Sequence, residues 1–117
     1  MTTSSDNTEL QTARARWMRL VEVGDLAAAL TLVDATASLA ERLGDPVWID
    51  RVRCNRAAIA LELGVGGSVV AELRTLLMRS EDTENEFLAA YTIARHYELA
   101  KEVRKGLFYA QLALDRA

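Results

Sequence analysis

The sequence is poor in the residues that mark several protein classes. Of its 117 residues, 6% are aromatic, one is proline and one is cysteine. An all-β domain would need more β-branched, aromatic and turn residues. A disulfide-stapled secreted domain would need several cysteines, and no apolar run approaches the roughly 18 residues of a membrane-spanning helix. These scarcities favour one ordinary helical domain.

The sequence also has no large excess of charge of either sign. Fourteen basic residues face 17 acidic ones, for a net charge of −3 and a pI near 5.2. Nucleic-acid binders usually carry a basic stripe, because phosphate neutralisation supplies much of their affinity. We therefore expect no nucleic-acid partner and no membrane partner. The first nine residues lack the basic and apolar regions of a secretory signal, which favours a cytoplasmic location.

Alanine and leucine are abundant: together they supply 36 of the 117 residues. Both are strong helix formers, and apolar residues recur along the chain at helical spacing. Glycine-containing breaks separate these periodic segments. The pattern predicts six helices, at about 9–23, 26–43, 46–63, 69–77, 84–100 and 103–117.

The residues at the breaks predict how the helices begin. Asp25 and Asp45 stand where N-caps are needed, and Pro46 follows at a first helical position, where its missing N–H costs nothing. Two further starts have the spacing of a capping box, at Thr8–Gln11 and Thr83–Glu86.

A short phrase recurs along the chain and indicates a repeat. Glu22-Val23-Gly24 returns 40 residues later as Glu62-Leu63-Gly64, and Glu98-Leu99-Ala100 follows 36 residues after that. Each phrase ends the first helix of a helix pair. The spacing predicts three helical hairpins of about 40 residues that stack on one another.

The segment from Gly24 to Pro46 resembles the longer tetratricopeptide repeats of bacterial regulators. Ala94, Tyr97, Gly106 and Ala113-Leu114 fit the small and bulky positions of that family in the third pair. The resemblance implies an all-α fold: a right-handed α-solenoid of three antiparallel helix pairs over residues 9–117, after a disordered tail at 1–8. It also implies a non-catalytic module that binds proteins.

In that family the first helix of each pair lines a concave groove that holds a peptide or a partner helix. The resemblance places these residues in the groove: Arg14, Met18, Arg51, Asn55, Tyr91 and Arg95. An asparagine can donate to and accept from a peptide backbone at once. Three arginines would make the groove cationic and suit an acidic or carboxylate-ended partner. The alternative is that they are ordinary exposed arginines paired with glutamates.

Catalytic and metal chemistry find little support. His96 is the only histidine and Cys54 the only cysteine, and neither stands at a metal-ligand spacing. Residues 64–68 lack the Gly-Lys-Ser/Thr ending of a phosphate loop. We therefore expect no enzyme activity, no metal and no cofactor. The open alternatives are a sensory domain that captures a short peptide and a small-ligand or enzyme domain.

The last helix is expected to have apolar residues on two sides. Its core face is predicted to be Val103, Leu107, Ala110 and Leu114. That choice leaves three large residues on the opposite side: Phe108, Tyr109 and Leu112. Large exposed apolar patches mark interaction sites. We therefore expect these three to form an oligomer or domain interface, with a homodimer through the C-terminal helix pair.

Overall fold

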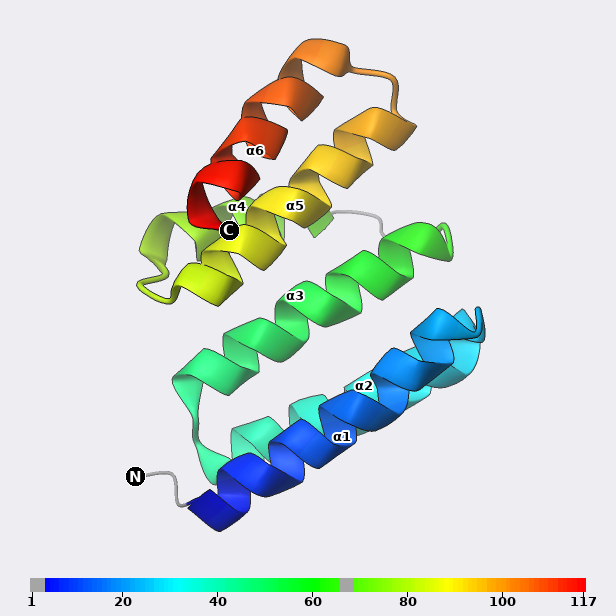
Figure 1. Cartoon of the computed structure of the whole chain (residues 1–117), viewed down its shortest axis with the longest axis vertical. Coiled ribbons are helices and arrows are strands. Elements are labelled where there is room, and N and C mark those ends of the chain that lie inside the picture. The colour runs from blue at the N-terminus through cyan, green and yellow to red at the C-terminus, as the bar shows by residue number, and fades with distance from the viewer. Residues whose placement is uncertain (1–3, 66–68) are drawn as a thin grey trace.

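The computed structural model describes residues 4–65 and 69–117, which form six helices (Figure 1). The helices are α1 Ser4–Glu22, α2 Leu26–Leu43, α3 Pro46–Glu62, α4 Val69–Arg79, α5 Thr83–Leu99 and α6 Val103–Arg116. This confirms the all-helical class and all six expected helices; the described residues contain no strand. Within these ranges, no helix has the length and apolar character to cross a membrane.

The aspartate caps are confirmed. The Asp25 carboxylate accepts a hydrogen bond from the N–H of Ala28 at 3.3 Å and starts α2. The Asp45 carboxylate accepts from the N–H groups of Val47 and Trp48 at 3.1 and 3.2 Å and starts α3. Each cap satisfies backbone donors that the first helical turn leaves free.

Two other helix starts differ from the expectation. Helix α1 begins at Ser4, so residues 4–8, predicted to be a disordered tail, belong to the helix. Serine and aspartate suit a helix N-terminus, which explains the earlier start. Helix α5 is capped by Asp82, whose carboxylate accepts from the N–H of Asn85 at 2.9 Å, and not by the Thr83–Glu86 box.

Helices α1, α3 and α5 end in the same turn. The second residue after the helix adopts left-handed backbone angles, with φ of 84° at Gly24, 78° at Gly64 and 60° at Lys101. The next N–H then donates to the carbonyl five residues back, at 2.9 Å, in Asp25→Leu20, Val65→Ala60 and Glu102→Tyr97. This is a Schellman motif. It aligns Lys101, and not Ala100, with the glycines of the first two copies.

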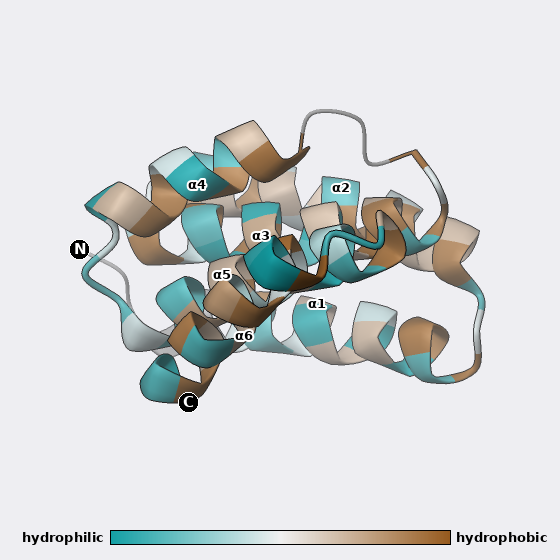
Figure 2. Ribbon diagram, turned by 90° about the horizontal axis from the view of Figure 1, so that it is seen from above, coloured by the Kyte–Doolittle hydropathy of each residue, from teal (hydrophilic) through white to brown (hydrophobic). Residues whose placement is uncertain are grey.

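Two apolar clusters meet on α3. The first joins α1, α2 and α3 around Trp17, Val33 and Val52. The second joins α3, α4 and α5 around Leu73 and Ile93. Seen from above (Figure 2), α2 and α4 lie on one side and α1 on the other, with α3 and α5 between them, and α6 runs obliquely to the side of α1, where the C-terminus lies. Helix α3 is therefore buried on two faces, and α6 packs against α5 at the far end of the molecule from α1 and α2 (Figure 1).

The left-handed position of Lys101 generates a stability prediction. An L-residue pays about 1–2 kcal/mol in this conformation and glycine does not, although glycine loses about 0.5–1 kcal/mol more on folding. We expect Lys101→Gly to raise the free energy of unfolding by about 0.5–1 kcal/mol, measured by urea denaturation. Ala100→Gly is the matched control, because Ala100 has right-handed angles (φ −82°), and it should not stabilise the protein. Equal effects of both substitutions would contradict the assignment.

Candidate functional site

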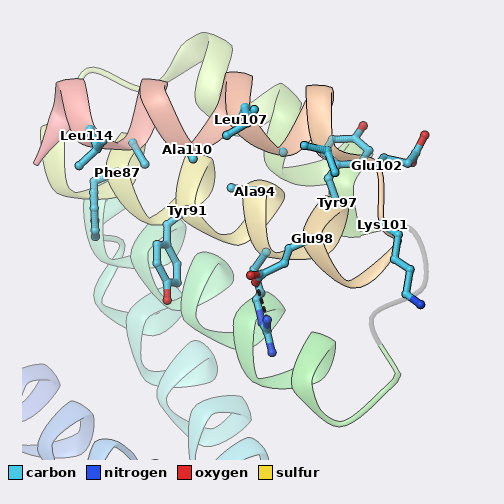
Figure 3. Close-up of a pocket in the computed structure, with 14 residues that line it drawn as sticks. Phe87, Tyr91, Ala94, Tyr97, Glu98, Lys101, Glu102, Leu107, Ala110 and Leu114 are labelled. Carbon is cyan, nitrogen blue, oxygen red and sulfur yellow. Dashed lines mark hydrogen bonds and ion pairs between the residues drawn. The ribbon is translucent and has the colours of Figure 1, made fainter.

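A groove lies between α5 and α6, and we call it the terminal groove (Figure 3). Its volume is about 750 Å³. Large apolar side chains form its walls: Phe87 and Tyr91 from α5, and Val103, Leu107 and Leu114 from α6. Small residues line the space between the walls: Ala94, Gly106, Ala110 and Ala113. A volume of this size and an apolar lining are typical of binding sites.

The close packing of α6 on α5 determines where the groove lies. A Cβ atom on Gly106 would lie 3.6 Å from the Cβ of Tyr97, which is an ordinary van der Waals distance, so the two helices are in contact here and there is room for a residue no larger than alanine. The Tyr97 and Tyr109 rings stack at 5.9 Å. Arg74 of α4 donates to both tyrosine hydroxyls, at 2.8 and 3.1 Å. These contacts fix the rotation of α6, and so they decide which of its faces is exposed.

That rotation corrects the predicted core face of α6. Val103, Leu107 and Leu114, expected in the core, are exposed and Ala110 is half-buried. The buried side instead uses Gly106, Tyr109 and Ala113. The sequence favoured the largest aliphatic residues for the interior, whereas a close contact between two helices selects small residues and one stacked ring.

The three residues predicted as an interface lie in different surroundings. Phe108 is 65% exposed and does not line the terminal groove. Tyr109 is half-buried against Tyr97, so its ring serves packing within the chain. Leu112 is also half-buried. The open apolar surface that was expected on this helix therefore exists, but its main part lies on the side opposite to the one predicted.

The predicted groove arginines lie on α1, α3 and α5, and each of them is paired with an acid. Arg14 reaches Glu84 at 3.2 Å, and Arg51 reaches Asp82 and Glu84 at 2.9 Å each. Arg95 donates to Glu62 at 2.7 Å and also pairs with Glu98. These partners neutralise the cations within the chain. The alternative expectation, of arginines paired with acidic residues, describes these three side chains.

The other predicted groove residues divide between the interior and the surface. Asn55 is buried, and its side-chain amide donates to the carbonyl of Arg51 in its own helix at 3.0 Å. Met18 is exposed on α1. Tyr91 and Arg95 line both the terminal groove and a second, smaller hollow of about 210 Å³, to which Val21, Leu26 and Ala58 also contribute. Tyr91, a residue of the predicted groove, therefore also belongs to the terminal groove.

Asn85 is a structural residue that the sequence reasoning missed. Its side-chain oxygen accepts from Arg51 at 3.2 Å, and its side-chain amide donates to the carbonyl of Val47 at 3.0 Å. It is buried and ties the first turn of α5 to the start of α3. Only its position three residues after the cap Asp82 distinguishes it in the sequence, and that signal does not reveal a partner 38 residues away.

The Cys54 thiol is unsuited to nucleophilic chemistry. Burial, reinforced by the negative charge of Asp50, raises the pKa of Cys54 to about 12. The thiol lies 3.8 Å from the carbonyl oxygen of Asn85. A thiol with this pKa stays protonated at neutral pH, and the thiolate is the reactive form. Within the described residues, no group of three histidine, cysteine or acidic side chains is arranged to hold a metal ion.

The comparisons with known proteins add no assignment: no protein-family model, no curated protein and no solved structure matches this chain.

Native Cys54 should resist alkylation. At pH 8 we expect iodoacetamide to modify it at least about 100-fold more slowly in the folded protein than in urea, because both burial and the raised pKa suppress the thiolate. The modified fraction is measured by intact mass over time. Modification of the folded protein at the rate of a free thiol would contradict the buried position.

Arg95 should control the ionisation of Glu62. Hydrogen bonds from the Arg95 guanidinium lower the pKa of Glu62 below its ordinary value. The pair therefore stabilises the fold above the unfolded pKa of glutamate, and this contribution is lost as the pH falls through the lower folded pKa. In Arg95→Met we expect the Glu62 pKa to rise, measured by NMR titration of its side-chain carboxyl carbon. An unchanged Glu62 pKa in folded Arg95→Met would contradict this assignment.

Proposed function

We propose that this chain is a non-catalytic protein-interaction module, and that the terminal groove binds an apolar helical surface of a protein partner. The observation that carries the proposal is the groove itself, an exposed apolar trough of about 750 Å³ along α5 and α6. Tyr91, Leu107 and Leu114 remain more than half exposed beside it. Exposed apolar surface of this kind is typical of interaction sites.

The dimensions of the terminal groove suit the binding of a helix better than the binding of an extended peptide. Helix α6 has 14 residues and is therefore about 21 Å long. A partner helix of about four turns would lie along its whole length. The groove offers side-chain walls and small residues between them, and it is not bordered by a free strand edge. A partner helix with apolar residues at positions i, i+3 or i+4, and i+7 would fill it.

We further propose that the chain is built as a tetratricopeptide-like, right-handed α-solenoid of three helix pairs. Support comes from the Schellman turns after α1, α3 and α5, although a similar turn at Gly44 also follows α2. The close packing of α1 on α2 and of α5 on α6 is typical of antiparallel hairpins, whereas α3 and α4, the second pair, are in only slight contact. In this interpretation the partner binds at the third pair, not in the concave groove, whose arginines already have acidic partners.

The proposal is tested by a matched pair of variants on α6. Leu107 and Phe108 are adjacent and each is 65% exposed, but only Leu107 lines the groove. Tagged wild-type protein, Leu107→Glu and Phe108→Glu are used to capture proteins from an extract of the organism that encodes the chain. Bound proteins, including untagged copies of the chain itself, are quantified by mass spectrometry. We expect at least about tenfold loss of the bound partner with Leu107→Glu and retention with Phe108→Glu.

Circular dichroism verifies that both variants fold. Retention of every captured protein by folded Leu107→Glu would contradict the assigned surface. Failure of the wild-type protein to bind any protein, its own copies included, would contradict the proposed function.

A further inference from the structure

We propose that the occupant of the terminal groove is a second copy of this chain, and that two α5–α6 hairpins pack face to face as a four-helix bundle. This inference rests on the proposed function and names the partner. Three features of the described residues carry it: the spacing of the apolar residues, the match between large and small residues across a twofold axis, and the area of the face.

Both helices present apolar residues at the spacing of a helix bundle. On α6 the groove residues Val103, Leu107, Ala110 and Leu114 follow one another by four, three and four residues. On α5 the apolar groove residues Phe87, Tyr91 and Ala94 follow one another by four and three residues, and the acidic Glu98 holds the next position, four residues on. This alternation keeps a seam on one side of a helix over its whole length. The hairpin therefore presents two parallel seams, as half of a four-helix bundle does.

The two seams match each other in size at two of three levels. Along the groove, Leu114 lies level with Phe87, Ala110 with Tyr91, and Leu107 with Ala94 (Figure 3). A twofold axis parallel to the helices preserves these levels and places α5 of one copy against α6 of the other. Tyr91 then faces Ala110 of the partner subunit, and Leu107 faces Ala94 of the partner subunit, so that at these two levels a large side chain meets a small one. At the third level two large side chains meet, Leu114 and Phe87 of the partner subunit, and they form an apolar contact at the end of the bundle.

The polar end of the groove is compatible with this arrangement. Glu98, Lys101 and Glu102 lie there with both signs of charge. The same axis brings the C-terminus of α5 beside the N-terminus of α6 of the other copy. Antiparallel neighbours of this kind place opposite ends of the helix dipoles together. No block of like charge opposes the pairing.

The area of the hairpin face approaches that of a stable interface. Helix α5 has 17 residues and is about 25 Å long, and two adjacent helices are about 20 Å wide, so the flat face is roughly 500 Å². Side-chain ridges raise the accessible area of such a face toward the about 800 Å² per partner of a standard interface. The face therefore falls between the small end of interface areas and the standard size, which is the range that a weak or moderate homodimer buries.

The test is the mass in solution at about 100 μM, by light scattering coupled to size exclusion and by sedimentation equilibrium. We expect wild-type protein and Phe108→Glu to have twice the 12.9 kDa of one chain. We expect Leu107→Glu to be monomeric, with a dissociation constant raised at least about 100-fold, because each copy would bury an unpaired carboxylate. Leu114→Glu, also at an exposed groove position, is the second variant if Leu107→Glu does not fold.

A monomeric wild-type protein would overturn the inference. Capture of another protein by wild type, lost in Leu107→Glu, would then still support the proposed function with a different occupant. A dimer that persists in both groove variants, or that is lost in Phe108→Glu, would place the interface elsewhere and would also overturn the inference. A dimer that only the groove variants abolish supports it.

Discussion

The burial of α3 on two faces is the constraint on which the rest of the fold depends. One cluster packs Val52 of α3 against α1 and α2, and the other packs Cys54 and Ala57 of α3 against α4 and α5. A helix in this position has no fully exposed side, so its polar residues need partners inside the protein. Arg79 gives Asp50 two hydrogen bonds at 2.7 and 2.8 Å. The helix is thus held by apolar contacts and paired charges together.

The same constraint accounts for the ion pairs of Arg51. Arg51 is held on α3 by Asp82, Glu84 and Asn85 at the start of α5. Its guanidinium fastens α3 to the start of α5 and lies over the Trp48 ring at 5.2 Å. A ligand carboxylate at this position would have to displace a carboxylate of the chain, with no net gain in ion pairing.

The sequence predicted the features that depend on neighbouring residues, and it missed those that depend on contacts between residues far apart in the chain. Periodicity located all six helices, and the caps Asp25 and Asp45 were identified because a cap acts on residues two or three positions away. The pairing of Arg14 with Glu84 spans 70 residues, and nothing in local sequence selects that acid. The repeat phrase located the third turn one residue early, because Lys101 occupies a position that glycine holds in the other copies. The orientation of α6 was wrong, since it depends on Gly106 and Tyr109 contacting Tyr97.

The groove follows from the packing of α6. Small residues allow α6 to lie close to α5, with Gly106 against Tyr97 and Ala113 buried. Because this close contact has no room for Leu107 and Leu114, these side chains stand at the surface and become the walls of a trough. A residue larger than alanine at position 106 would push α6 outward and change both the helix contact and the groove. The shape of the groove and the packing of α6 on α5 are therefore set by the same few residues, and a substitution at any of them acts on both.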